Sequence, residues 1–184
     1  YVSYALTVRQ PGGHSSTPPP QSAIGILSAA IAKLEANPFP GGMTGPSKEM
    51  FAAFGPEMPF AQRAVFANLW LFSPLVERML SGAPETNAIV RTTTAVTMIS
   101  GGVKDNVLPP EAKAVVNFRI LPGETYKSVC ERITKIIDDD RVEIAAIEKE
   151  PRDPSPVSDV NAAPFKVLEK TIREIKKKKV GIFS

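Results

Sequence analysis

Residues 87–120, NAIVRTTTAVTMISGGVKDNVLPPEAKAVVNFRI, carry the pattern of two strands joined by a short loop. The first half is rich in β-branched residues, lacks proline and ends at a pair of glycines, which favours a strand. After the loop, apolar side chains recur at every second position, as on one face of a strand, at Ala114, Val116, Phe118 and Ile120. The stretch therefore predicts two neighbouring antiparallel strands.

Related patterns precede this pair of strands. Residues 1–9 alternate in the same way, so they are expected to form a strand with one buried face. Residues 20–38 place apolar side chains three and four positions apart, which is typical of a helix with one buried stripe. Pro20 is expected in its first turn and Pro38 just beyond its end. The stripe comprises Ile24, Leu27, Ile31 and Leu34.

A second helix and a last strand follow the pair. Thr125 suits the N-cap of a helix whose apolar stripe comprises Val129, Ile133, Ile136 and Ile137. Residues 141–149 then predict the last strand. The order strand, helix, strand, strand, helix, strand predicts an α+β fold, the ferredoxin-like βαββαβ sandwich. In that fold a four-stranded antiparallel sheet carries both helices on one face.

Residues 38–84 interrupt the order between the first helix and the second strand. They are rich in Gly, Pro, Met and Phe, too broken for long elements and too apolar for a solvated linker, which predicts a packed helical insertion. One helix is expected near residues 47–54, and another up to Gly82, kinked or split at Pro74. Its stripe of Phe66, Leu69 and Trp70 favours a core role, with ligand contact by Trp70 or Phe72 as the alternative.

The domain organisation follows from these elements. We expect one domain over residues 1–149, with the helical insertion at about 38–84. Residues 150–184 predict a linker followed by a helix over about 162–176 that lacks a partner in this chain, and we interpret them as the start of a further domain. The chain opens on Tyr1 without an initiator Met, so we expect it to be part of a longer protein.

Composition excludes several classes of protein. The 184 residues are 43% hydrophobic and 22% charged, as in soluble globular domains, and no signal peptide or apolar run of 18 residues is present. The net charge of +3 owes much to one lysine run, 176–179, so neither nucleic acid nor a membrane is implied as a partner. The single cysteine, Cys130, excludes an internal disulfide and is expected to be a small core residue. The compartment stays unknown.

The only histidine, His14, lies in PGGHSSTPPP, residues 11–20. A catalytic metal site needs about three protein ligands, usually including histidine, so this chain is not expected to hold a metal by itself. Glycines on one side permit close approach, and prolines on the other stiffen the loop. A loop of this kind is typical of a histidine that reaches into a site formed mostly by other parts of the protein. The alternative is a loop histidine that caps a helix or bonds to the backbone.

Two further polar residues are candidates for substrate binding. Asn106 lies in a connection restricted by prolines, and Arg119 points from its strand away from the core face. A turn-forming Asn and a solvated strand Arg are the simpler interpretations. A neutral histidine, an amide and a guanidinium would together bind a carboxylate and an adjacent carbonyl oxygen.

The motifs GGHSSTPP (residues 12–19) and TNAIVRTTTAVTMISGGVKDNVLPPEAKAVVNFRILPGET (residues 86–125) resemble a known family. They are similar to the lid, or dimerisation, domain of the zinc-dependent aminoacylase and carboxypeptidase metallopeptidases. The resemblance extends from residue 1 to about 147. The insertion with NLWLFSPLVERML (residues 68–80) points to the carboxypeptidase S branch, which includes the N-fatty-acyl-amino-acid synthase/hydrolases.

The resemblance implies that the residues of the active site are divided between two domains. Two zinc ions and a general base belong to the catalytic domain, outside this chain, and the lid closes over a small peptide or N-acyl amino acid. His14 then corresponds to the lid histidine that stabilises the oxyanion, from the neighbouring subunit in dimeric members. Asn106 and Arg119 correspond to residues that bind the substrate carboxylate. In dimers, the first helix and the edge of the second strand form the contact.

These implications make the chain the lid of a hydrolase that cleaves an amide bond next to a free carboxylate, and the chain alone is expected to be inactive. The alternative is a non-catalytic ferredoxin-like module for oligomerisation or ligand binding. A nucleic-acid-binding module would need aromatic residues on the open face of the central strands, where the pattern offers none.

Overall fold

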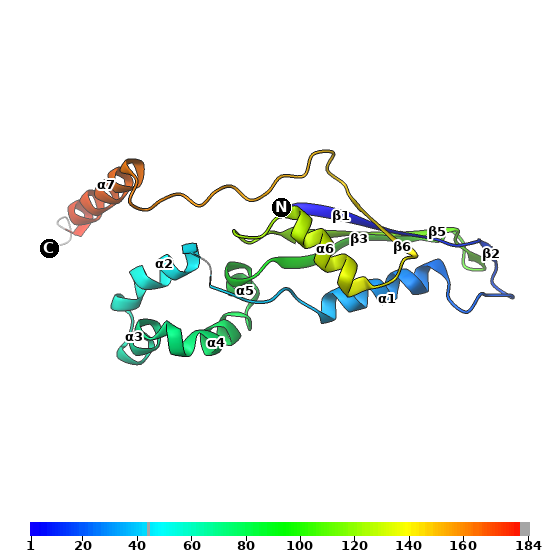
Figure 1. The fold of residues 1–184 in the computed structure, drawn as a ribbon, viewed down its shortest axis with the longest axis horizontal. Helices are drawn as coiled ribbons and strands as arrows, with labels where there is room; N and C mark the ends of the chain where they lie inside the picture. Colours follow the sequence, from blue (N-terminus) through cyan, green and yellow to red (C-terminus); the bar gives the residue numbers. More distant parts are fainter. Residues whose placement is uncertain (44, 181–184) are drawn as a thin grey trace.

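The computed structural model describes residues 1–43 and 45–180. Its main sheet has four antiparallel strands in the order β3-β5-β1-β6, comprising β1 (Val2–Arg9), β3 (Thr93–Gly101), β5 (Glu111–Arg119) and β6 (Val142–Ala146). The helices α1 (Ala23–Ala36) and α6 (Tyr126–Ile137) lie together on one face of it (Figure 1). The predicted ferredoxin-like βαββαβ sandwich is confirmed.

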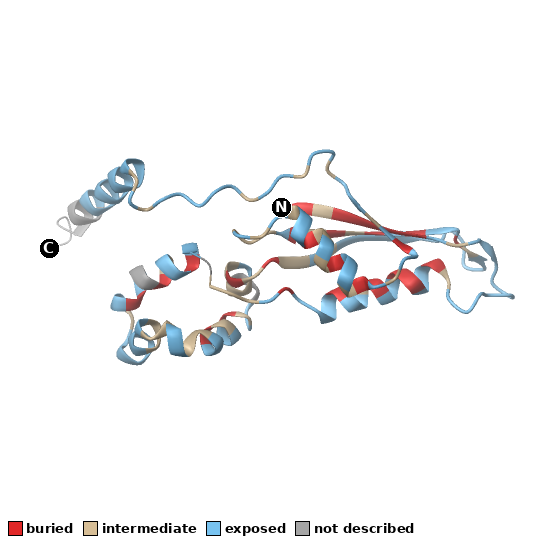
Figure 2. Cartoon of the chain, viewed as in Figure 1, coloured by how far each residue is buried: buried red, intermediate tan, exposed pale blue. Residues whose placement is uncertain are grey.

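The core lies between the sheet and these two helices. Every second residue of β1 and β5 faces the helices and is buried, because strand side chains alternate between faces. Phe118 is fully buried at the centre, where its ring meets Tyr4 and Phe39 edge to face with centroids 6.0 and 5.9 Å apart. Figure 2 shows the buried residues concentrated along β1, α1 and the inner side of α6.

The first helix begins later than the sequence predicts. Ser22 is its N-cap and its hydroxyl accepts a hydrogen bond from the Gly25 amide at 3.1 Å, so Pro20 lies before the helix and not in its first turn. The prediction that Ile24 belongs to the buried stripe is also wrong, because its side chain is 41% exposed and lies beside the edge of β3. The stripe that meets the sheet uses small residues as well as large ones: Ala23, Ile26, Leu27, Ala30 and Leu34.

The second helix matches its prediction closely. The Thr125 hydroxyl accepts from the Ser128 amide, and the Ser128 hydroxyl accepts from the Thr125 amide, each at 3.0 Å. This reciprocal capping box fixes the start of α6. Val129, Ile133 and Ile137 are buried below it. Cys130 is half-buried and packs against the core, as expected for a small apolar residue.

The insertion consists of short helices, α2 (Gly45–Phe54), η1 (Gly55–Glu57), α3 (Phe60–Ala67), α4 (Leu69–Leu80) and α5 (Pro84–Val90). They enclose a small second core of Phe51, Val76, Leu80 and Val90. The long predicted helix divides at Asn68, whose side-chain amide donates to the Ala64 carbonyl at 2.8 Å, while Pro74 is accommodated within α4.

Two further expectations for the insertion are wrong. Residues 87–90 are helical and not the start of a strand, because Pro84 occupies a first-turn position that favours a helix. The insertion therefore extends to Val90, beyond the predicted limit at 84. Trp70 is 81% exposed and lies outside the second core, whereas Phe66 and Leu69 pack against that core.

The chain enters and leaves the sheet side by side. The Ile147 amide donates to the Ser3 carbonyl at 2.9 Å, and the Ser3 amide donates to the Glu148 carboxylate at 3.1 Å. Residues 147–162 contain no helix or strand and lead to α7 (Ala163–Val180). Along α7, residues 163–175 are exposed (Figure 2). None of the helices in the described part of the chain is long and apolar enough to cross a lipid bilayer.

Candidate functional site

A narrow ribbon projects from one end of the sheet (Figure 1). It consists of β2 (Gly13–His14) and β4 (Val107–Leu108), which continue the paths of β1 and β5 past the last pair of the sheet, Arg9 and Glu111. Gly12 crosses so close to β4 that a Cβ atom there would lie 3.1 Å from the Leu108 carbonyl oxygen. Any other residue at this position would force the Leu108 backbone to shift by a few tenths of an ångström, so glycine favours the close approach of the two segments.

The ribbon brings two of the predicted site residues together. His14 pairs with Val107, and the Ser15 amide donates to the Asn106 carbonyl oxygen at 3.1 Å. Asn106 lies in a tight turn that the Val107 amide closes onto the Lys104 carbonyl at 3.3 Å. His14 and Asn106 are both exposed, so their polar groups are available to another molecule.

The imidazole of His14 is held by its own loop. Its Nδ1 accepts a hydrogen bond from the Ser16 amide at 3.2 Å, and the Ser16 hydroxyl lies 2.9 Å from the same nitrogen. The Thr17 amide donates to the His14 carbonyl at 3.2 Å, which closes a turn around the two serines. The ring is therefore oriented by local bonds to Nδ1, and the His14 side chain is exposed.

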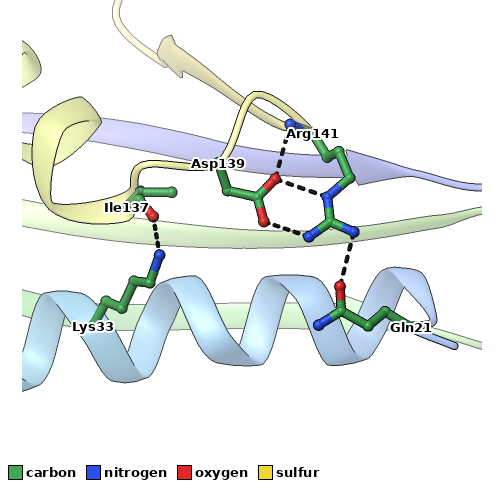
Figure 3. Close-up of polar contacts among 5 residues, drawn as sticks. All are labelled: Gln21, Lys33, Ile137, Asp139 and Arg141. Atoms are coloured by element: carbon green, nitrogen blue, oxygen red, sulfur yellow. Dashed lines mark hydrogen bonds and ion pairs between the residues drawn. The ribbon is translucent and has the colours of Figure 1, made fainter.

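A polar clasp anchors the far end of this loop (Figure 3). Arg141 donates to the Gln21 side-chain oxygen at 2.8 Å, and its guanidinium also forms an ion pair with Asp139 at 2.6 Å. Hydrogen bonds from Arg141 hold the pKa of the Asp139 carboxyl below its ordinary value, at about 2. Nearby, Lys33 donates to the Ile137 carbonyl and ties α1 to the end of α6. The loop of His14 is thus fixed at both ends.

Sequence reasoning missed this clasp. Gln21 and Arg141 lie 120 residues apart, so no local spacing indicates that they meet. Beside the clasp, α6 ends at Ile137, and Asp138 adopts the left-handed conformation that is common at the end of a helix, with φ of 45°.

Arg119 lies away from the other two site residues. It ends β5, eight residue steps from Glu111, so a rise of roughly 3.3 Å per residue puts it about 26 Å from the base of the ribbon. Its guanidinium stacks on the exposed ring of Tyr1, 5.1 Å from the centroid. The structure of one chain therefore brings His14 and Asn106 together and does not bring Arg119 to them.

The described residues offer no cluster of metal ligands. Across residues 1–43 and 45–180, no group of three or more His, Cys, Asp and Glu side chains is arranged to hold a metal ion. The ion pairs of Arg9 occupy Glu111 and Glu143 at 3.0 and 2.5 Å, on the open face of the sheet. The described residues thus do not fit a zinc centre of their own.

Comparison with known proteins identifies the class to which this fold belongs. Residues 1–145 match the model of the peptidase dimerisation domain, and the chain belongs to that family. A metallo-carboxypeptidase of the M20 family from Sulfolobus solfataricus, Sso-CP2, shares the fold with a TM-score of 0.57 and 17% identity. That likeness covers 95% of this chain and 42% of the other.

Curated relatives place the chain in the predicted branch of the family. N-fatty-acyl-amino acid synthase/hydrolase PM20D1 of Xenopus tropicalis is 43% identical over 177 residues, which are 95% of this chain and 34% of that protein. Probable carboxypeptidase S-like 2 of Dictyostelium discoideum is 41% identical over 171 residues, 93% of this chain and 33% of that protein. The chain therefore spans about a third of the length of these relatives.

Proposed function

We propose that this chain is the lid of a di-zinc hydrolase that cleaves an amide bond next to a free carboxylate, in a peptide or an N-acyl amino acid. The lid comprises residues 1–149, and residues 150–184 lead back to the catalytic domain. The adjacent entry and exit of the chain at Ser3 and Ile147 support an inserted domain of this kind. Because the described residues do not fit a zinc centre, the proposal assigns both metal ions and the general base to residues outside this chain.

The observation that carries the proposal is the position of His14 and Asn106 next to each other on one exposed ribbon, where His14 pairs with Val107 and the Ser15 amide binds the Asn106 carbonyl. A neutral imidazole with hydrogen on Nε2 donates a hydrogen bond to a carbonyl oxygen. That bond strengthens as the oxygen becomes negative in the tetrahedral intermediate, so it lowers the barrier more than it tightens substrate binding. The amide of Asn106 would donate to the carboxylate of the same substrate.

Arg119 supports a site shared between two subunits. A guanidinium binds a carboxylate through two parallel hydrogen bonds, and Arg119 is exposed at the end of the sheet where the chain enters. Because the ribbon lies at the opposite end, one lid cannot bring Arg119 and His14 to one small substrate. In a homodimer, each active site would take Arg119 from its own subunit and His14 with Asn106 from the other.

The edge of the sheet supports such a homodimer. Among the described strands, β3 pairs only with β5, and its outer edge carries Met98 and Ile99, 66% and 63% exposed. Beside it, Ile24 of α1 is exposed and lines a hollow of about 200 Å³ with Ile99. An unpaired edge with apolar side chains favours association with a second copy.

Replacement of His14 in the full-length protein tests the proposal. We expect His14→Ala to lower kcat by roughly 10²–10³, the scale for loss of one oxyanion donor, with no loss of zinc. Val103→Ala, which shortens a fully exposed side chain in the adjoining loop, is the matched control and should leave kcat unchanged. Wild-type turnover in His14→Ala would contradict the oxyanion role. Absence of any zinc-dependent amide hydrolysis would favour the non-catalytic oligomerisation module.

A further inference from the structure

Two polar groups of Ser16, its backbone amide and its hydroxyl, converge on a single atom, Nδ1 of His14. The backbone amide lies 3.2 Å from it and the hydroxyl oxygen 2.9 Å. Neutral histidine carries one hydrogen, on either Nδ1 or Nε2, and only the bare nitrogen can accept a hydrogen bond. The partners of Nδ1 thus determine which nitrogen is bare.

The hydroxyl of Ser16 fits either form, since it can donate to a bare Nδ1 or accept from a protonated one. The amide does not, because a backbone N–H only donates. A hydrogen on Nδ1 would point at the hydrogen of the Ser16 amide and leave that amide without its acceptor. The geometry therefore disfavours the form with hydrogen on Nδ1.

We propose that Ser16 is a positioning residue, which holds His14 in the form with hydrogen on Nε2 and aims that hydrogen away from the loop. The turn closed by Thr17 brings Ser16 back over the ring, and the bond from Ser15 to Asn106 keeps this turn on the ribbon. The consequence for catalysis rests on the proposed function. There, Ser16 prepares the donor that the oxyanion would receive, and it has no contact with the substrate itself.

The position of hydrogen on His14 can be measured directly, because this histidine is the only one in the chain. Long-range ¹H–¹⁵N correlation spectra of the 184-residue chain at alkaline pH, where imidazole is neutral, distinguish the two nitrogens. The same chain unfolded in urea gives the intrinsic ratio of the two forms. We expect folding to reduce the fraction with hydrogen on Nδ1 at least threefold relative to the unfolded chain.

Variants of the loop separate the two donors. Ser16→Ala keeps the amide and removes the hydroxyl, so the Nδ1–H fraction should rise partway, whereas Ser16→Pro removes both donors and should restore the unfolded ratio. Ser16→Thr should retain the wild-type ratio, and so should Ser15→Ala, since Ser15 holds the ribbon through its backbone. If the folded wild type shows the unfolded ratio, or if Ser16→Ala and Ser16→Pro both match the wild type, the proposal is wrong.

A kinetic measurement on the full-length protein connects Ser16 to His14. Ser16→Ala should lower kcat by roughly threefold to tenfold, the scale of one neutral hydrogen bond, and should have no further effect when His14 is already alanine. An equal loss in both backgrounds would overturn the positioning role. Failure of the proposed function would look different. His14→Ala would then keep wild-type turnover, while the spectra of the wild type and of the Ser16 variants would still show the expected Nδ1–H fractions.

Discussion

The backbone amide of Ser15 donates to the carbonyl oxygen of Asn106 at 3.1 Å, which joins the loop of His14 directly to the turn of Asn106. Since His14 also pairs with Val107, the two candidate groups lie on the same ribbon. A motion of the ribbon as a whole would carry both to a substrate, whereas loss of the pairing would separate them.

Gly12 should control whether the ribbon forms. Gly12→Ala places a Cβ atom 3.1 Å from the Leu108 carbonyl oxygen, a backbone atom that would have to shift by a few tenths of an ångström, so the pairing should loosen. Amide exchange of Ser15, measured by NMR, is expected to become at least severalfold faster. The free energy of unfolding should change by less than about 1 kcal/mol, because the ribbon is exposed.

Gly13 provides the matched control for this test. A Cβ atom there meets nothing within 4 Å, so Gly13→Ala should leave the exchange of the Ser15 amide near its wild-type rate. Equal acceleration by both substitutions would mean that close approach at Gly12 is not what the ribbon requires.

Phe118 should contribute more to stability than any exposed aromatic residue. Its ring is fully buried between Tyr4 and Phe39, so Phe118→Ala is expected to lower the free energy of unfolding by about 3–5 kcal/mol. Urea unfolding followed by circular dichroism measures this difference. Phe60→Ala, at a ring that is 77% exposed, should cost less than about 0.5 kcal/mol. Similar losses for both would argue against Phe118 as the centre of the core.

Asp139 should make the stability of the clasp depend on pH. Because Arg141 holds its folded-state pKa at about 2, against about 3.9 in the unfolded chain, the folded form favours the charged carboxylate. The stabilisation is complete above about pH 4 and is lost as the pH falls through about 2. Between those values, the free energy of unfolding of Asp139→Asn should fall less steeply with acid than that of the wild type.

Asp140→Asn is the control for this pH dependence, since it removes the neighbouring carboxylate and leaves the bonds from Arg141 to Asp139 in place. Its unfolding free energy, measured by urea titration at several values between pH 2 and 5, should follow the wild-type slope. If Asp139→Asn also follows that slope, the clasp does not contribute to the pH dependence of the free energy of unfolding.

Much of the fold was predictable because its strands carry simple patterns. One buried face at every second residue identifies β1 and β5, and the cap at Thr125 identifies α6. Errors arose where the contacts are long-range. Nothing local indicates that Ile24 meets the β3 edge and not the core. At residues 87–90 the local signals conflict, because Pro84 favours the start of a helix while the β-branched residues after it favour a strand.

The roles of the candidate residues stay predictions, and their geometry was only partly predictable from the sequence. Glycine, histidine and proline spacing indicated a rigid loop at His14, and the ribbon does place Asn106 beside it. The remoteness of Arg119 follows from the length of β5, which spans the whole sheet. The strand predicted from the sequence already lies between Asn106 and Arg119, so its length could have indicated that the two residues do not meet within one chain.

Ile99 should contribute to self-association. Ile99→Lys places a charge on the exposed edge of β3 beside Ile24, and a lysine at an edge strand opposes pairing with another sheet. We expect the dissociation constant of the dimer, measured by analytical ultracentrifugation, to rise at least tenfold. Val157→Lys changes an equally apolar residue, 51% exposed in the linker, and should leave the constant unchanged. The same shift in both variants would point to net charge and not to the edge.

Arg119 should determine the affinity for substrates that carry a free carboxylate. Removing a guanidinium that binds the substrate equally in the ground state and the transition state raises KM and leaves kcat nearly unchanged. In the full-length protein, Arg119→Ala is therefore expected to raise KM roughly tenfold to hundredfold, the scale of a hydrogen bond to a charged group. The matched control is Lys113→Ala, which removes a positive charge from the same face of β5 and should leave KM unaffected. Substrates whose carboxylate is capped as an amide provide the decisive comparison, because they lack the charge that Arg119 would bind. If Arg119→Ala raises KM equally for capped and free substrates, its role is structural, through the stack on Tyr1.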